Sequence, residues 1–361
     1  MKRFDSWVYE TAPCLKGSPY RDAACGLVDA ALQLGNGAEA WLLKTCCAYA
    51  LFHLKRELEE RLDDPLPYLI GGLQRNAEML RRAGEAMPCM KYSQPLVESA
   101  AAIPQTTATH YANLFAAFPQ DKYFDEPVKL LKVRLERNGY PFEHFPRWAG
   151  LDLGCGNGRY TLALRRLGFR TVVGVDFSTM NIRDAVRRLQ ESSLSNVSYC
   201  VGSALDLPFE DDSFDFVFHN GVLHHTLDMR GGVREMLRVL KKGGVGYHHV
   251  MPSPGGIHWD MVEILRVVMH GVPFEYARNV VSLLGVPPNL RYLMLDHIMV
   301  PINTRLTREE AERMLREAGA VSIRKLMRGA DFDREERITR GEPYADVKYG
   351  IGGNRYYFEK A

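Results

Sequence analysis

A glycine-rich stretch near the middle of the chain has the residue types that hold a nucleoside. Gly154, Gly156 and Gly158 follow a short apolar run, and Asp176 ends the next apolar run, 22 residues after the first glycine. Glycine lets a backbone approach a ligand closely, because no Cβ is in the way. An acid at about this distance can accept the hydroxyl groups of a ribose. Asp176 could instead cap a helix, although Ser178 could do that equally well.

The spacing of these glycines argues against a nicotinamide dinucleotide. The dinucleotide pattern needs a small residue one place further on, so that a helix can pack closely on a strand. That place holds Arg159 in this chain. The turn is therefore expected to bind a different nucleoside ligand.

Histidines are the second group of residues that could do chemistry. Their ordinary pKa lies near neutrality, which suits a general base. Seven of them stand around the ends of predicted strands or in the segment after residue 252: His219, His224, His225, His248, His249, His258 and His297. Alternation along a strand sends His248 and His249 to opposite faces, so one of them could point into a pocket. His297 could be oriented by Asp296, and each histidine could also be an ordinary hydrogen-bonded residue of the core or surface.

The elements that must position these residues alternate in type. The apolar runs predict strands at 150–153, 171–175, 197–201, 214–218, 245–250, 321–327 and 355–359. The amphipathic stretches predict helices at 158–167, 179–191, 230–240 and 307–318. This order is typical of a parallel sheet covered by helices on both faces, with right-handed crossovers.

The remaining segments predict three parts in the chain. Residues 1–100 are expected to form a helical domain, because no alternating strand pattern precedes residue 145. Residues 101–147 are expected to be lid or approach helices, and residues 148–361 the core. A helical cap insertion at 252–304 and a long loop at 331–354 both follow core strands. They should lie near the carboxyl edge of the sheet, where open α/β sheets bind ligands.

With these elements in order, the chain resembles the class I S-adenosylmethionine-dependent methyltransferases, in their small-molecule (type 11-like) branch. The motifs that carry the resemblance are Leu151–Arg159, Ser203–Phe209, Ser213–Phe218, Gly221–His225 and Leu237–Gly244. The resemblance covers residues 145 to 251 and continues near 305 to 360. It implies an α/β fold with a Rossmann-like, mostly parallel seven-stranded sheet, S-adenosyl-L-methionine as cofactor, and methyl transfer by in-line displacement.

The resemblance also implies which residues hold the cofactor. Asp152, Gly154 and Gly156 are expected at its amino-acid end, and Asp176 at its ribose. Phe177 and Leu205 are the expected walls of the adenine slot.

The contact at the edge of the adenine is left open. Many relatives have an acid directly after the glycine of the third strand, and this chain has Ser203 there. The contact could come from Ser203, from Asp206, or from the backbone of Ala204.

Two further positions are expected near the cofactor. Asn220 and Gly221 should face its methionine part, and the following Val222-Leu223 disfavours methylation of a nucleobase or glutamine nitrogen. Tyr111, with Phe115, Tyr123 and Phe124, could close over the cofactor or could simply pack helices onto the sheet.

A base is needed only when the attacking atom arrives protonated. The candidates are His249, His297 and His225, although the His224–His225 pair recurs in relatives as a structural pair. No dense group of acids follows the fourth strand, so no metal is expected.

Composition limits the partners. The net charge of +2 gives no reason to expect a nucleic acid or a membrane surface. No run of 18 apolar residues, no secretory signal and no Cys-x-x-Cys spacing is present, so a cytoplasmic protein is expected.

The methyl acceptor is expected to be a small or medium-sized metabolite, at oxygen or nitrogen in the first place and carbon otherwise. The alternatives are a peptide or carrier-bound substrate docked by the helical N-terminal domain, and a regulatory protein that binds S-adenosylmethionine without catalysis. A homodimer is left open.

Overall fold

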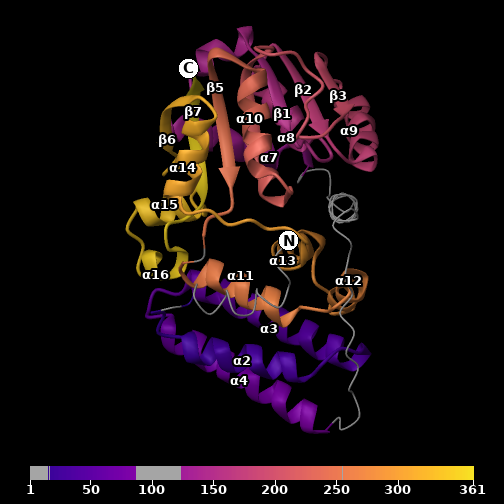
Figure 1. Cartoon of the computed structure of the whole chain (residues 1–361), viewed down its shortest axis with the longest axis vertical. Coiled ribbons are helices and arrows are strands. Elements are labelled where there is room, and N and C mark those ends of the chain that lie inside the picture. The colour runs from indigo at the N-terminus through magenta and orange to yellow at the C-terminus, as the bar shows by residue number, and fades with distance from the viewer. Residues whose placement is uncertain (1–14, 16, 87–122, 254) are drawn as a thin grey trace. The chain divides into compact units, whose positions relative to one another are not determined.

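The computed structural model describes residues 15, 17–86, 123–253 and 255–361, and in this part of the chain the apolar runs after residue 148 form one seven-stranded sheet (Figure 1). Its strands are β1 (Ala149–Leu153), β2 (Thr171–Asp176), β3 (Val197–Val201), β4 (Phe214–Asn220), β5 (Leu240–Val250), β6 (Ala320–Lys325) and β7 (Asn354–Lys360). The order across the sheet is β3-β2-β1-β4-β5-β7-β6. Strands β1 to β5 pair in parallel, and β7 is antiparallel to both of its neighbours. The predicted fold class is confirmed.

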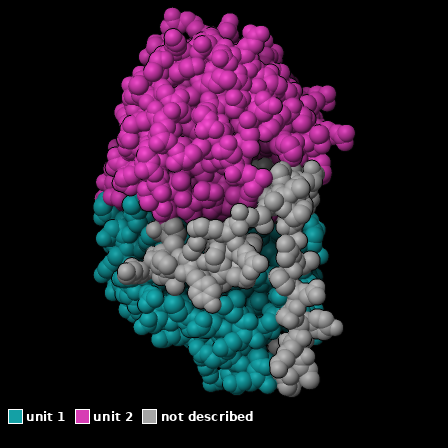
Figure 2. All heavy atoms as spheres, viewed as in Figure 1, with its two compact units in different colours: residues 1–102, 254–300, 341–351 teal, residues 103–253, 301–340, 352–361 magenta. Residues whose placement is uncertain are grey.

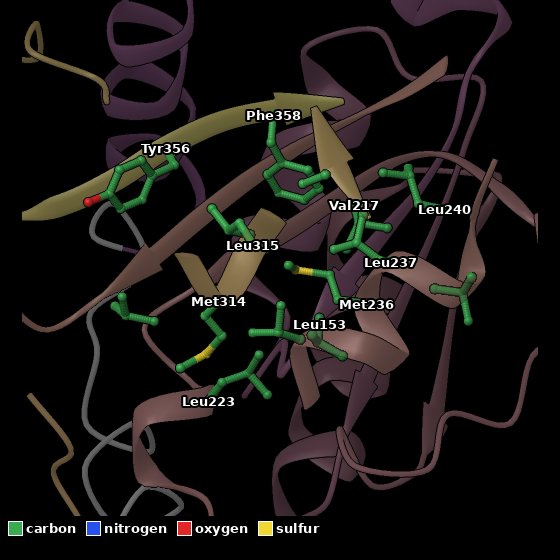
Figure 3. Close-up of a cluster of buried hydrophobic side chains, with 14 of the residues drawn as sticks. Leu153, Val217, Leu223, Met236, Leu237, Leu240, Met314, Leu315, Tyr356 and Phe358 are labelled. Carbon is green, nitrogen blue, oxygen red and sulfur yellow. The ribbon is translucent and has the colours of Figure 1, made fainter. Parts of the chain in front are cut away.

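Alternating side chains of β4 explain why both faces of the sheet are covered. Phe216 and Phe218 pack with residues of α7 (Glu126–Arg137) and α8 (Arg159–Arg166). Val217 points the other way, into a cluster with residues of α10 (Met229–Val239) and α14 (Arg308–Glu317). Figure 3 shows this second cluster, in which Met236, Met314 and Phe358 lie with Val217. A central strand buried on both faces is what a parallel sheet requires.

The carboxyl ends of the parallel strands share one edge of the sheet. Residues 153, 176, 220 and 250 end β1, β2, β4 and β5. Helix α9 (Thr179–Ser192) and the short helix η2 (Leu223–His225) begin just beyond two of these ends. Asp176, Asn220 and the glycine turn after β1 therefore lie at the edge where α/β sheets bind ligands.

The chain divides into two compact units, coloured separately in Figure 2. The sheet belongs to the unit made of residues 103–253, 301–340 and 352–361, and the other unit comprises 1–102, 254–300 and 341–351. The helices of the other unit are α2 (Arg21–Gln33), α3 (Ala38–Glu60), α4 (Leu66–Ala86), α11 (Ile257–Val268), α12 (Phe274–Leu283), α13 (Pro288–Met299) and α16 (Ala345–Tyr349). The expected insertion thus folds largely with the N-terminal helices.

Helix α11 is the centre of this helical unit. It contacts α2, α3, α13 and α16, and eleven of its twelve residues are buried. A helix that is buried almost all round needs partners on every side, which explains why three separate chain segments form one unit. In the described part of the chain, no helix has both the length and the apolar character to cross a membrane.

Three α-helices of the described part of the chain were not predicted. Helix α13 stands in the insertion, and α15 (Arg334–Thr339) and α16 stand in the segment expected to be a loop. Within the segment 101–147, for which lid or approach helices are expected, residues 101–122 lie outside the described residues. The boundaries 1–100, 101–147 and 148–361 stay a prediction.

Candidate active site

The glycine turn after β1 is tied to the end of β2. Gly154, Gly156 and Gly158 all have positive φ angles, of 72°, 55° and 86°. The backbone N–H groups of Gly154 and Cys155 donate to the carbonyl oxygen of Val175, at 2.8 and 2.9 Å. These bonds hold the turn against the strand that ends at Asp176.

Asp176 is held by hydrogen bonds that leave it able to accept more. Its carboxylate accepts from the backbone N–H groups of Gly156 and Ser178, both at 2.9 Å, and from Nδ2 of Asn181 at 3.1 Å. A carboxylate has about four acceptor positions, so room remains for a ligand hydroxyl. Burial raises the pKa of Asp176, while these bonds act in the opposite direction. The helix cap is supplied by Ser178, whose Oγ accepts from Asn181 N, so Asp176 is not needed for that purpose.

Asp152 stands next to the glycine turn in drier surroundings. It is 3% exposed and accepts from Oγ1 of Thr161 at 2.6 Å. Burial raises its pKa to about 7. In the same turn, Oδ1 of the buried Asn157 has no hydrogen-bond partner. A cationic amino group bound here would compensate the negative charge of Asp152 and could donate a hydrogen bond to Oδ1 of Asn157.

At Gly154, the first glycine of the turn, a side chain would point at another part of the protein. A Cβ on Gly154 would lie 2.4 Å from Cγ2 of Val222. We expected from the sequence that a side chain at this position would block the cofactor. That reason is corrected here, since the first obstacle is the side chain of Val222.

The predicted adenine side lies beyond β2 and β3. Phe177 is 51% exposed, which leaves its ring open to stack against a base. Oγ of Ser203 accepts from the backbone N–H of Leu205 at 3.1 Å, and Asp206 is exposed. Ala204 is half-buried between them. The choice between Ser203, Asp206 and the backbone of Ala204 stays open.

The aromatic residues expected at a lid fall into two groups. Tyr111 and Phe115 lie outside the described residues. Tyr123 is buried, its hydroxyl donates to the carbonyl oxygen of Asn157, and the guanidinium carbon of Arg188 lies 4.5 Å from its ring centroid. Tyr123 therefore packs against the glycine turn.

Strands β4 and β5 place four polar residues as two pairs. The register sets His219 opposite His248 and Asn220 opposite His249. Alternation sends the two pairs to opposite faces.

In the first pair, Nδ1 of His219 and Nδ1 of His248 are 2.9 Å apart. Nε2 of His219 accepts from the backbone N–H groups of Val222 and Leu223, at 3.2 and 2.9 Å. His219 therefore carries its proton on Nδ1 and donates it to His248. Burial lowers the pKa of both rings, that of His248 to about 3. This neutral pair anchors the turn that follows β4.

In the second pair, Nδ1 of His249 lies 3.2 Å from Oδ1 of Asn220. His249 is half-buried, and burial lowers its pKa, helped by the positive charges of Arg355 and Arg134. The ring is neutral near pH 7 and has a lone pair available without losing a proton first.

The two other candidate histidines have different settings. Nδ1–H of His225 donates to the carbonyl oxygen of Ile302 at 2.6 Å, and the ring is 8% exposed. His297 belongs to the helical unit, where its ring packs edge-on to His258 and Trp259. Asp296 and His297 are consecutive residues of helix α13 (Pro288–Met299). Their side chains leave the helix axis in directions about 100° apart, because an α-helix has 3.6 residues per turn.

Comparison with known proteins identifies the family. Residues 151–247 match a family described as Methyltransferase domain. Demethylmenaquinone methyltransferase of Staphylococcus aureus is 30% identical over 176 residues, which cover 48% of this chain and 68% of that protein. The chain belongs to the class I S-adenosylmethionine-dependent methyltransferases. The expected resemblance is confirmed, and the chain is an enzyme of the methyltransferase class.

Solved structures of similar fold include other methyltransferases. One is solved as a complex with the Haloferax volcanii Trm112 methyltransferase activator; it is 20% identical, covers 73% of this chain and 97% of its own, and has a TM-score of 0.43. The PH0226 protein of Pyrococcus horikoshii OT3 is also 20% identical, covers 69% of this chain and 99% of its own, and has a TM-score of 0.40. The fold assignment rests on the strand order and pairing of this chain.

Two residues near the candidate site were not singled out from the sequence. Thr161 holds Asp152, and the buried Asn303 follows the segment that accepts from His225. The pairing of Asn220 with His249 could have been suspected, because both residues end neighbouring strands. Nothing in the sequence marks Asn303. Among the described residues, no three His, Cys, Asp or Glu side chains come together as a metal site would require.

Proposed function

We propose that this methyltransferase transfers a methyl group from S-adenosylmethionine to a small or medium-sized metabolite. The acceptor atom is oxygen or nitrogen in the first place, with carbon as the other option. The observation that carries the proposal is the placement of the glycine turn, Asp176 and the Asn220–His249 pair along one edge of the sheet.

Residues on this edge fit the cofactor. Asp152 and the glycine turn would hold its amino-acid end, Asp176 its ribose, and Phe177 its adenine. When bound, the cofactor supplies an electrophilic methyl group on a cationic sulfur. The protein aligns the acceptor with that methyl group and excludes water, and these are the main tasks in an in-line displacement.

His249 is the proposed base among the three candidates. It ends β5 beside Asn220, its ring is neutral, and part of the residue remains exposed. His225 is less suited, because it is buried and one of its nitrogens is engaged. The name of the S. aureus relative, which refers to a quinone, supports a small acceptor.

The test is transfer of an isotope-labelled methyl group to small-molecule and protein extracts of cells that make this chain, read by mass spectrometry. We expect the label in a small molecule. Label in a polypeptide would favour the carrier-bound alternative. Binding of S-adenosylhomocysteine without transfer to any extract would favour a non-catalytic binding protein and would contradict the proposal.

A further inference from the structure

One face of helix α9 carries polar side chains, of which two are buried. Asn181, Asp184 and Arg188 follow one another at intervals of three and four residues, which places their side chains on the same side of the helix. Asn181 is 3% exposed and Arg188 is 8% exposed, whereas Arg183 on another side of the helix is exposed. Asparagine and arginine are mostly exposed in folded proteins, so a buried polar face calls for partners.

Asn181 holds the acid at the end of β2. Its Nδ2 donates to Oδ1 of Asp176 at 3.1 Å, and the backbone N–H of Ser178 donates to the same oxygen at 2.9 Å. The other oxygen, Oδ2, accepts from the backbone N–H of Gly156 at 2.9 Å. Each carboxylate oxygen has about two acceptor positions, so the described residues leave the room for a ribose hydroxyl at Oδ2. Asn181 therefore helps to set the rotation of this carboxylate.

Asp184 holds a side chain of the glycine turn. Its Oδ2 accepts a long hydrogen bond of 3.4 Å from Nδ2 of Asn157, while its Oδ1 pairs with the exposed Arg187. Asn157 is 1% exposed, and its Oδ1 has no hydrogen-bond partner. The oxygen and the nitrogen of an amide point in different directions. The bond to Asp184 therefore decides where Oδ1 of Asn157 points.

Arg188 acts on the same turn through Tyr123. Its guanidinium carbon lies 4.5 Å from the centroid of the Tyr123 ring, a distance at which the face of an aromatic ring attracts a cation. The hydroxyl of Tyr123 donates to the carbonyl oxygen of Asn157. Asn157 is therefore held twice from α9, by its side chain directly and by its backbone through Tyr123. Because the same helix also holds Asp176, it keeps these two parts of the site at a fixed separation.

We propose that this face of α9 positions the cofactor site at both ends. Asn181 orients Asp176 for the ribose. Asp184 and Arg188 orient Asn157, and with it the turn that receives the amino-acid end of S-adenosylmethionine. All three are positioning residues, because each acts through another residue and none contacts the cofactor itself. This inference rests on the proposed function and adds the residues that set the affinity for its cofactor.

Two ligands separate the two ends of the site. S-adenosylhomocysteine has a nucleoside and an amino-acid end, whereas 5′-methylthioadenosine has the nucleoside alone. Asp184→Ala and Arg188→Ala should each weaken binding of S-adenosylhomocysteine about fivefold, the equivalent of about 1 kcal/mol, and leave binding of methylthioadenosine unchanged. Asn181→Ala should weaken binding of both ligands by the same factor. Isothermal titration calorimetry, with methylthioadenosine at millimolar concentration, measures these affinities.

Matched variants show whether the contacts act as proposed. Asp184→Asn keeps an acceptor oxygen for Asn157 and should restore the wild-type affinity. Tyr123→Phe keeps the ring beside Arg188 and removes only the hydroxyl, so it should weaken binding of S-adenosylhomocysteine alone. It tests the same route should Arg188→Ala not fold. Arg183→Ala removes an exposed arginine from the same helix and should change neither affinity.

A purely structural role predicts that the affinities for both ligands fall together with the melting temperature. A parallel loss of both ligands in Asp184→Ala and Tyr123→Phe, or wild-type affinities in both variants, would overturn the assignment to the amino-acid end. Weaker binding of S-adenosylhomocysteine alone in Asn181→Ala, or no binding of methylthioadenosine to the wild type, would overturn the assignment of Asn181 to the ribose. Failure of the wild type to bind S-adenosylhomocysteine would instead contradict the proposed function.

Discussion

At the scale of single residues, Asp152 and Asp176 differ in what surrounds them. Asp176 accepts two backbone N–H groups and one amide N–H, whereas Asp152 has the hydroxyl of Thr161 and is buried. Hydrogen bonds favour the charged form of a carboxyl group and burial disfavours it. Asp176 is thus prepared for the hydroxyl groups of a ribose, and Asp152 for a positive charge.

Replacing Asp176 should weaken cofactor binding. Asp176→Ala removes the acceptor of a charge-assisted hydrogen bond, so the affinity for S-adenosylmethionine should fall by roughly 1.5–3 kcal/mol. Isothermal titration calorimetry measures the change. Ser178→Ala is the matched control, because it removes the helix cap and should leave the affinity nearly unchanged. An Asp176→Ala protein of wild-type affinity would remove the basis for the ribose assignment.

Asp152 should make cofactor binding depend on pH. With its pKa raised to about 7, the free protein holds Asp152 largely neutral below that pH. A bound ammonium group favours the ionised form, so the affinity should rise between pH 6 and pH 8, by at most about tenfold per pH unit. Calorimetry in buffers of different ionisation enthalpy should show release of a proton near pH 6.5. Asp152→Asn should lose this proton release; its persistence in the variant would assign the pH effect to another group.

At the scale of elements, the register between β4 and β5 separates a structural pair from a chemical one. His219 and His248 bond to each other and to the backbone of Val222 and Leu223. Asn220 and His249 stand on the other face, with Nε2 of His249 left available. Two adjacent histidines therefore differ in role because a strand alternates its side chains.

The His219–His248 pair should make the fold sensitive to acid. Both folded-state pKa values lie below the ordinary value, so the unfolded chain binds more protons as the pH falls below about 6.5. The stabilising contribution is complete above that pH and is lost on acidification. His248→Asn should reduce the slope of the unfolding free energy between pH 5 and pH 6.5, by up to about 1.4 kcal/mol per pH unit. Urea unfolding at several pH values measures this slope. His144→Asn is the control, because the side chain of His144 is half-exposed. Equal slopes in the wild type and His248→Asn would contradict the account.

At the scale of the whole molecule, the sequence predicted the sheet better than the helices around it. Alternating apolar runs and the turn at Gly154 depend on local pattern, and all seven strands formed where expected. Helices α13, α15 and α16 are stabilised by partners distant in sequence, such as the contacts of α11 with α13 and α16, which no local pattern reveals. The polar side-chain atoms of His224 and Asn303 have no hydrogen-bond partner. This too depends on the tertiary structure and cannot be seen in a local sequence pattern.

The acceptor is expected to be selected by segments outside the common core. These are residues 101–125, 252–304 and 331–352, and their role in selecting the acceptor stays a prediction. His249→Ala and His297→Ala should leave the affinity for S-adenosylmethionine within about threefold, or roughly 0.7 kcal/mol. Because His249 is the proposed base, His249→Ala should lower turnover by ~100-fold, the low end for loss of a general base. Steady-state kinetics across the pH range tests this, and full turnover in His249→Ala would contradict the assignment and leave catalysis to proximity and exclusion of water.

The most direct test of the central claim is a thermal shift with four ligands. A ligand that binds the native state raises its melting temperature. S-adenosylmethionine and S-adenosylhomocysteine should each raise the melting temperature of this chain, because Asp152, the glycine turn and Asp176 fit them. NAD and NADP should not, because Arg159 stands where a dinucleotide site needs a small residue. A shift with NAD or NADP, or none with either S-adenosyl compound, would contradict the account.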